Sequence, residues 1–251
     1  MVRFFSLTRR EVSRFVKIKG QTIGAPLLET FLYISVFGAA LGTRVGDLDG
    51  VGYTVYVIPG LILMAWAINA FTNNASSILQ QKFQRSIDDQ LSSPASPIQL
   101  LMAFTLGGFL RGMTISVITF VLGSFLVDLP VEHVWVLIAS LLLVGMFFSQ
   151  IGVLIGVRAE QFDDVSFAQT FILQPLIFLG GIFYSASLLP EPYQTLTHFN
   201  PVYYMISTVR YGFLGIADVS ISLSLLGLLA ATTLLFLVNY RLFVTGYKLR
   251  S

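Results

Sequence analysis

Long apolar runs, separated by short polar stretches, dominate this chain of 251 residues. A membrane-spanning helix needs about 20 largely apolar residues, and six runs reach that length: roughly 23–42, 53–76, 98–126, 134–157, 165–184 and 217–240. The runs are continuous, which argues against the alternating strands of a membrane β-barrel. Because a helix satisfies its own backbone hydrogen bonds in lipid, the pattern predicts an all-α polytopic membrane protein with six transmembrane helices.

Composition supports a lipid-covered surface. Hydrophobic residues make up 55% of the chain and charged residues 11%, whereas a soluble domain carries about 25% charged residues. The absence of cysteine excludes disulfides and thiolate metal sites. The basic N-terminus is not a signal peptide, because no small-residue cleavage site follows an apolar core.

The distribution of basic residues predicts the orientation. With six spans, one side of the membrane holds both termini and 12 of the 15 lysines and arginines. Positive charge concentrates in cytoplasmic loops. We therefore expect both termini in the cytoplasm, with residues 43–52, 127–133 and 185–216 outside.

Residues 4–20 alternate apolar and basic positions in the manner of an interfacial amphipathic helix, with its basic face toward anionic headgroups. Two functions remain open for this helix. It anchors the topology, or it relays movement along the membrane surface.

A second amphipathic helix is predicted at 78–91, in the first cytoplasmic loop. Its apolar positions recur every fourth residue, on one helix face: Leu79, Phe83, Ile87 and Leu91. Between them, two basic residues balance two acidic ones: Lys82 and Arg85, Asp88 and Asp89. A helix that lies on lipid headgroups is usually rich in Lys and Arg. The balanced charge therefore favours docking to a protein partner over docking to lipid.

Motifs for chemistry are missing from the sequence. It contains no phosphate-binding G-x-x-x-x-G-K-[ST] loop, no H-E-x-x-H zinc motif and no G-x-S-x-G nucleophile elbow. The two histidines, His133 and His198, lie in separate external loops, so we expect no metal site. The acidic run at 160–164 is expected to cap the helix that follows it. We expect neither catalytic residues nor a cofactor on this chain.

Two charges fall within predicted spans. Arg111 lies near the middle of the third span and Glu29 about two turns into the first. Such residues usually face the bundle interior and find partners. We expect Arg111 to point inward, paired with Glu29 or lining a polar path. Alternatively, Glu29 extends to the interface. Glycines spaced four apart, at 108 and 112 and at 152 and 156, are expected to allow close helix packing.

The stretch 186–215, before the last span, is aromatic and broken by prolines. We predict two short helices that dip into the outer leaflet and return. Asn200 and Pro201 are expected to start the second helix, as N-cap and first helical residue.

Three segments together resemble the type-2 ABC transporter permeases. They are "YVIPGLILMAWAINAFTNNASSILQQKFQRSIDDQLSSP", "VRAEQFDDVSF" and "GGIFYSASLLPEPYQTLTHFNPVYYMISTVRYGFLG", and the similarity covers nearly the whole chain. The resemblance implies a six-span half-transporter, paired with a second permease copy, which we expect to be identical, around a central pathway. It also implies two copies of a separate ATPase subunit, which would hold ATP and Mg²⁺.

The same resemblance assigns roles to particular residues. The 78–91 helix would dock on the ATPase as a coupling helix, through Leu79, Phe83, Arg85, Ile87, Asp88, Asp89 and Leu91. The re-entrant pair at 186–215 would form the outer gate, with Pro190, Asn200, Pro201 and Tyr204. The substrate path would run against spans 2 and 5, past Asn69, Phe71, Asn73, Phe171, Gln174 and Phe178.

The function expected from the sequence is therefore the permease subunit of an ATP-driven exporter of an amphiphile, such as a drug, lipid or glycan. An ion-coupled secondary transporter is the alternative, but it would favour internal repeats and acids at mid-depth. An intramembrane enzyme would need a convergent polar cluster. Neither feature is found in the sequence.

Overall fold

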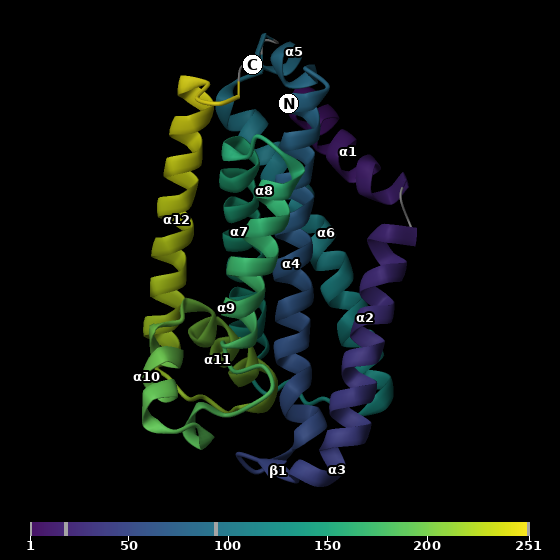
Figure 1. Ribbon diagram of the computed structural model, residues 1–251, viewed down its shortest axis with the longest axis vertical. Coiled ribbons are helices and arrows are strands. Elements are labelled where there is room, and N and C mark those ends of the chain that lie inside the picture. Colours follow the sequence, from purple (N-terminus) through teal and green to yellow (C-terminus); the bar gives the residue numbers. More distant parts are fainter. Residues whose placement is uncertain (1, 18–19, 93–94, 250–251) are drawn as a thin grey trace.

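The computed structural model describes residues 2–17, 20–92 and 95–249, which are almost entirely helical (Figure 1). Within this part of the chain, four helices are long and apolar enough to cross a membrane: α4 (Tyr53–Phe83), α6 (Pro97–Leu126), α7 (Val134–Arg158) and α12 (Ile221–Thr245). Four of the predicted spans are thereby confirmed as long helices. Their starts agree with the predicted ones within four residues.

The other two apolar runs are helical but interrupted. Around the first run the chain forms η1 (Gly20–Gly24), α2 (Ala25–Tyr33), η2 (Ile34–Leu41) and α3 (Gly42–Val45), where η1 and η2 are π-helical. Around the fifth it forms α8 (Phe162–Phe167), the π-helical η3 (Ala168–Leu173) and α9 (Gln174–Phe178). This helix ends before residue 184, the predicted end, because the chain turns at Gly181, which has a positive φ of 86°. That these two runs cross the membrane stays a prediction.

The helices have two distinct ends. One end carries both termini and α5 (Ser86–Ser92), and we call it the α5 end (Figure 1). The opposite end, which we call the hairpin end, carries the antiparallel strands β1 (Asp47–Leu48) and β2 (Val51–Gly52). Asp49 and Gly50 connect the strands with positive φ values of 50° and 84°, as a tight two-residue hairpin requires.

Helix α4 is the centre of the bundle. Most of its residues are buried, and it packs against both α6 and α7. Glycines make the close approach possible. A Cβ added to Gly152 would lie 2.5 Å from the carbonyl oxygen of Phe71, and one added to Gly156 would lie 2.9 Å from that of Ala75. Gly108 meets the side chain of Asn74 in the same way. The predicted role of these glycines in close helix packing is confirmed.

Helix α12, by contrast, is attached at few points. Only Leu228, Asn239 and Phe243 are buried along it. The side-chain amide of Asn239 donates to the backbone oxygen of Gln150 at 2.8 Å and to its side-chain oxygen at 2.7 Å. Gln150 in turn donates to the hydroxyl of Thr105 at 3.1 Å. Polar bonds between α6, α7 and α12 therefore hold a helix that fully buries few of its residues and leaves several of its leucines exposed.

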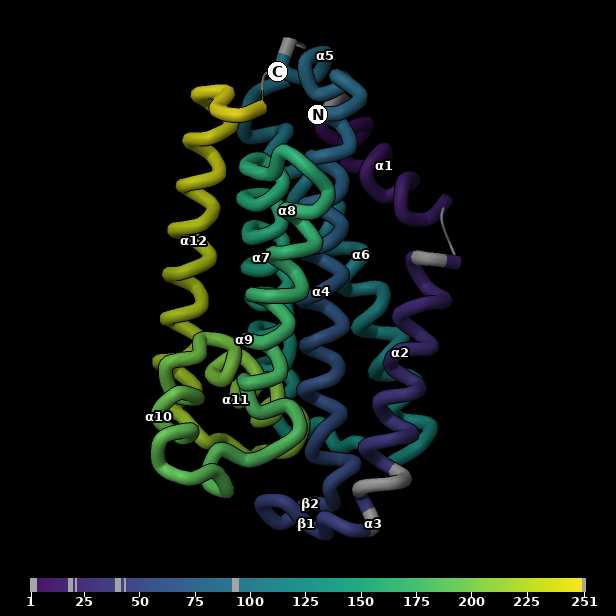
Figure 2. The backbone as a smooth tube through the Cα atoms, viewed as in Figure 1, coloured from purple at the N-terminus to yellow at the C-terminus, as the bar shows by residue number. Residues whose placement is uncertain are grey.

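The chain after α9 forms η4 (Ala186–Leu188), α10 (Glu191–Phe199) and α11 (Pro201–Leu214) at the hairpin end, as Figure 2 traces. The prediction of two short helices is confirmed. Asn200 caps α11, since its Oδ1 accepts from the backbone N–H of Val202 at 3.0 Å, and Pro201 is the first helical residue. The amide of Asn200 also donates to the carbonyl of Leu176 at 2.6 Å, which ties α11 to α9.

We expect Asn200→Ala to lower the free energy of unfolding by about 1–2 kcal/mol, because a buried cap is lost. Asn200→Asp keeps the capping oxygen but loses the donor to Leu176. Asn200→Asp should therefore keep most of the protection of the α11 amides from hydrogen exchange, whereas the amides of α9 should exchange faster. Hydrogen exchange over 174–178 and 201–208 separates the two contributions, and equal exchange in the native chain and both variants would contradict the assignment.

Candidate functional site

The segment predicted as one coupling helix, 78–91, is divided in the structure. Helix α4 continues to Phe83, the chain reverses at Gln84 and Arg85, and α5 begins at Ser86. Arg85 has a positive φ of 53°, and its N–H donates to the carbonyl of Lys82 at 3.0 Å. The prediction of a single helix is therefore wrong. Residues 78–83 extend a membrane-spanning helix, and α5 alone is the short helix of the loop.

The division separates the four expected apolar anchors. Leu79 and Ile87 are buried within the chain itself, at 1% and 2% exposure, and Leu91 is half-buried. Phe83 is the exposed member, at 58%. Its ring stacks on that of Phe162, at the start of α8, with centroids 5.3 Å apart. Two of the four expected anchors therefore complete the core of this chain, and Phe83 is left as the exposed one. That this segment binds a partner stays a prediction.

The polar members of the segment lie at the surface of the α5 end. Arg85 and Asp89 are exposed, and Asp88 is half-buried. Together with Phe83 they form a mixed apolar and charged patch at the turn between α4 and α5. The patch keeps the chemistry expected of a protein-binding surface, on fewer residues than the sequence indicated.

A buried acid joins the N-terminal helix α1 (Val2–Lys17) to α4. Glu11 is 1% exposed. Its carboxylate accepts from the hydroxyl of Ser77 at 2.5 Å and from the side-chain amide of Gln81 at 3.1 Å. Arg10 lies 3.0 Å away on the same helix. The approach to α6 is also tight, because a Cβ added to Gly107 would lie 2.7 Å from the Cβ of Glu11.

Two arginines extend this network to other elements. Arg14 donates to the backbone oxygen of Asn73 at 2.6 Å and to its side-chain oxygen at 2.9 Å. Arg10 donates to Gln81 on α4 and to Gln90 on α5, both at 2.9 Å. We call Arg10, Glu11, Arg14, Asn73, Ser77, Gln81 and Gln90 the Glu11 cluster. It connects α1, α4 and α5, the arrangement that a movement-relaying α1 would require.

The turn after α7 is fixed to the same end of the bundle. Lys82 donates to the carbonyls of Val157 at 2.9 Å and Ala159 at 2.6 Å. The carboxylate of Asp164 accepts from the backbone N–H groups of residues 160 and 161, which confirms the expected acidic cap of the following helix. Lys248 pairs with Glu160 at 2.7 Å. This hydrogen bond and charge lower the pKa of Glu160 below its usual value.

The six residues expected along a substrate path do not share one surface. Phe71 and Asn73 have no exposed area, since Phe71 packs on α7 and Asn73 binds Arg14. Asn69 is also buried and donates to the carbonyl of Ala65 at 2.9 Å. Phe71 and Asn73 are thus enclosed within this chain, and Asn69 borders a small pocket beside α2. That these three residues line a path between two copies stays a prediction.

The other three expected path residues lie on a different helix with open surface. Phe171 is 67% exposed and stacks on Phe167, with centroids 5.0 Å apart. Gln174 and Phe178 on α9 are half-buried. The 162–178 helix therefore keeps an accessible aromatic face, whereas Asn73 and Ser77 on the polar half of α4 are bound by α1.

The two intramembrane charges lie apart. Among the described residues, no ion pair joins Glu29 to Arg111. Glu29 is on the exposed side of α2 and Arg111 is half-buried on α6. Pairing with Glu29, one of the two alternatives expected for Arg111, is therefore not found in the described part of the chain, and the other alternative, that Arg111 lines a polar path, stays a prediction. The extension of Glu29 to the interface stays a prediction.

A buried arginine at the hairpin end was not expected from the sequence. Arg210 on α11 is 1% exposed. It donates to the carbonyl of Gly181 at 2.6 Å, pairs with Asp218 at 3.3 Å, and its Cζ lies 3.8 Å from the ring centre of Tyr56. From the sequence, Arg210 is expected only to be a basic residue in the external segment 185–216. The structure makes it the link between α4, α11 and the loops at 179–185 and 215–220.

Tyrosines and Pro190 complete this end of the molecule. Tyr53 and Tyr56 donate from α4 to the carbonyls of Phe183 and Tyr184, at 3.2 and 3.4 Å. Tyr204 donates to the carbonyl of His198 at 2.9 Å. Pro190 precedes α10 as its N-cap. The residues expected at the outer gate therefore lie together, around the α10–α11 pair.

Comparison with known proteins assigns this arrangement to a family. The family model described as ABC-2 type transporter matches residues 2–214, from the start of α1 to the end of α11. This chain belongs to the ABC-2 type transporter family. The match includes the Glu11 cluster, the α4–α5 turn and Arg210, so all three features lie in the part of the chain that the family shares.

Two relatives extend the comparison. The inner membrane transport permease YadH of Escherichia coli strain K12 is 40% identical over 247 residues, covering 98% of this chain and 96% of YadH. Nodulation protein J of Rhizobium leguminosarum bv. viciae is 25% identical over 237 residues, covering 90% of this chain and 88% of the relative. The similarity to YadH extends through α12, beyond the segment matched by the family model.

Proposed function

We propose that this chain is the membrane-spanning permease subunit of an ABC exporter in the inner membrane of a prokaryote. Membership of the ABC-2 family and similarity to a protein named as an inner membrane transport permease support this function. The sequence contains no G-x-x-x-x-G-K-[ST] loop, so ATP and Mg²⁺ would bind to a separate ATPase. Two ATPase copies and a second permease copy would complete the transporter.

The observation that carries this proposal is the architecture of the α5 end. The patch at Phe83, Arg85 and Asp89 is exposed, and directly beneath it the Glu11 cluster joins α5 to α4 and α1. A force applied at α5 would therefore act on two further helices through a network of polar contacts that is partly buried. An ion-coupled secondary transporter would have no use for such a cytoplasmic docking surface, and family membership also argues against it.

The proposed topology has six crossings, with both termini and α5 in the cytoplasm. The four long helices supply four crossings, and the interrupted helices at 20–45 and 162–178 supply two. The α10–α11 pair then enters the outer leaflet as a gate. Movement of α5 would change the arrangement of the 162–178 helix through the Phe83–Phe162 stack. An amphiphilic substrate would pass along the exposed aromatic face of that helix, beside Phe171, Gln174 and Phe178.

Phe83→Asp tests the docking surface. The variant is expected to lose ATPase co-purification and substrate-stimulated ATP hydrolysis by at least tenfold, because a new charge replaces an exposed aromatic anchor. Tyr247→Asp is the matched control. Tyr247 is 52% exposed and also lies at the α5 end, in the turn after α12. This control is expected to keep both activities.

Arg85→Glu provides a second test without changing an apolar group. Reversal of this exposed charge should weaken ATPase binding and make it more dependent on salt. The permease's own melting temperature verifies folding in each variant. Full ATPase binding by folded Phe83→Asp and Arg85→Glu chains would place the ATPase contact elsewhere.

A further inference from the structure

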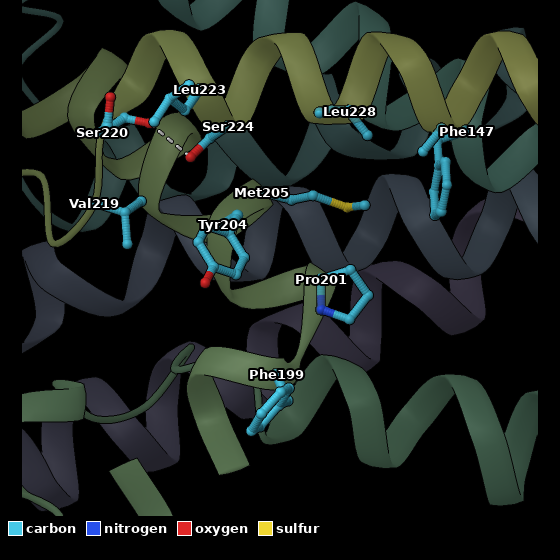
Figure 3. A pocket seen from close by; sticks show the side chains of 12 residues that line it. Phe147, Phe199, Pro201, Tyr204, Met205, Val219, Ser220, Leu223, Ser224 and Leu228 are labelled. Atoms are coloured by element: carbon cyan, nitrogen blue, oxygen red, sulfur yellow. Dashed lines mark hydrogen bonds between the residues drawn. The ribbon is translucent and has the colours of Figure 1, made fainter. Parts of the chain in front are cut away.

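An apolar pocket of about 580 Å³ lies at the hairpin end, between α7, α11 and α12 (Figure 3). Figure 3 shows Ser224 and Leu228 of α12 on one side, Tyr204 and Met205 of α11 on another, and Phe147 of α7 at one end. Pro201 and Tyr204 of the proposed gate line the pocket, but neither the proposed substrate path along the 162–178 helix nor the Arg210 contacts use its interior. Its volume lies within the range of about 300–1,000 Å³ that is typical of small-molecule sites.

The lining offers no charge and little hydrogen bonding to a ligand. Among the residues that form it, none carries a charged side chain. The hydroxyl of Ser224 already donates to the carbonyl of Ser220 at 2.8 Å, and that of Tyr204 to His198 at 2.9 Å. Water in such a pocket would make few hydrogen bonds. The chemistry therefore selects an apolar, uncharged ligand.

The rim of the pocket is continuous with the open face of α12. Leu223 is 71% exposed and Phe199 is 82% exposed, and both line the pocket. Farther along α12, Leu226 and Leu234 are also exposed, at 62% and 63%. In a chain that crosses a membrane, this surface contacts lipid acyl chains. Lipid acyl chains therefore surround the pocket at high concentration, and they are apolar and uncharged, as its lining requires.

We propose that this pocket binds one acyl chain of a phospholipid from the membrane leaflet at the hairpin end. The headgroup would remain at the interface near Ser220, where α12 begins, and the chain would extend past Met205 and Leu228 toward Phe147. The bound chain would fill the space between α11 and α12. It would thereby support α11 on the side away from its buried Arg210.

Gly227 offers a way to close the pocket. It lies on the pocket wall in α12, and a Cβ added there meets no atom within 4 Å. Gly227→Phe should therefore fill the pocket without displacing a helix. Ala230→Phe is the matched control, because Ala230 is exposed on the same helix and does not line the pocket. Both variants add an aromatic ring to α12, but only Gly227→Phe places the ring inside the pocket.

The test uses the full-length chain in nanodiscs of phosphatidylethanolamine and phosphatidylglycerol, with a small fraction of phosphatidylethanolamine that carries a photoreactive diazirine on one acyl chain. After illumination, mass spectrometry maps the adducts. We expect native protein and Ala230→Phe to carry adducts on 201–205 and 223–231. In Gly227→Phe, the yield of these adducts should be at least fivefold lower. Adducts near Trp135, which is 80% exposed outside the pocket, should stay constant in all three proteins.

Three results would overturn the proposal. Equal labelling of the pocket residues in native protein and Gly227→Phe would mean that the probe reacts from the general lipid surface. Labelling of pocket residues no stronger than that near Trp135 would mean that no chain is held. Absence of pocket adducts, with normal adducts elsewhere, would mean that phospholipid does not enter the pocket. The pocket would then be a candidate binding site for a transported amphiphile. None of these measurements depends on ATPase binding.

Discussion

Glu11→Ala is expected to destabilise the permease by about 3 kcal/mol, because breaking a buried ion pair leaves its partners uncompensated. Ser77 and Gln81 would lose their acceptor, and Arg10 and Arg14 would keep their charge without the carboxylate. Both arginines retain some contact with water, at 44% and 25% side-chain exposure. The expected loss is therefore at the lower end of the range for buried pairs. Thermal unfolding in detergent measures it.

The same variant is expected to uncouple transport from ATP hydrolysis, because α1 would lose its bonds to α4. Glu11→Gln retains the size and one acceptor oxygen, so its loss of stability should be about 1 kcal/mol. Arg9→Ala is the control on the same helix. Arg9 is exposed, and a surface change of this kind stays within about 0.5 kcal/mol. Native stability and coupled transport in Glu11→Ala would show that α1 is only a topology anchor.

Arg210→Met is expected to destabilise the hairpin end by about 3 kcal/mol, because it removes the cation of a buried pair. The carboxylate of Asp218 and the carbonyl of Gly181 would lose a donor, and Tyr56 would lose the guanidinium stacked on its ring. Methionine fills similar space, so the loss reports on the charge and its hydrogen bonds. Hydrogen exchange over 179–185 and 201–220 should increase most, since Arg210 connects these segments.

A double-mutant cycle isolates the pair. Asp218→Asn alone should leave Arg210 without its counter-ion, and combining it with Arg210→Met should recover part of the lost stability. Arg210→Lys keeps the charge without the fork of donors that reaches both Gly181 and Asp218. Its stability should lie between those of the native chain and Arg210→Met. Additive losses in the cycle would mean that Arg210 and Asp218 do not stabilise each other.

The long helices could be predicted from the sequence because their signals are local. Runs of more than 20 apolar residues leave few structures possible in lipid, and α4, α6, α7 and α12 begin close to their expected positions. The start of α11 was equally local, since Asn200 and Pro201 determine it by their own hydrogen-bonding chemistry. The hairpin at 47–52 could also have been found, because Asp49–Gly50 is a strong two-residue turn signal.

The break between α4 and α5 could not be predicted from hydrophobic periodicity. Leu79, Phe83 and Ile87 recur every four residues on both sides of the break, and Gln84 and Arg85 are ordinary helix-forming residues. What ends α4 is tertiary: Arg85 turns the chain so that Ile87 packs back into the core. A pattern that suits one continuous helix therefore also suits two that fold onto the same core.

The burial of charged residues could not be predicted from the sequence for a related reason. Glu11 lies among arginines in an amphipathic helix, and such a pattern usually places its polar face toward lipid headgroups. Its burial depends on Ser77 and Gln81, more than sixty residues away. The polar stretch on α4 that includes Ser77 and Gln81 is visible in the sequence. The missing step was to pair it with α1, which no local signal identifies.

The sparse attachment of α12 has a consequence for how this protein is made. Helix α12 leaves the ribosome after α4, α6 and α7, and the packing of α4 against α6 and α7 does not require it. The earlier helices can therefore assemble first and present Gln150 and Thr105 as an unfilled polar receptor in the bilayer. When α12 arrives, Asn239 is the residue that recognises this receptor. One asparagine thereby fixes the register at which α12 joins the earlier helices.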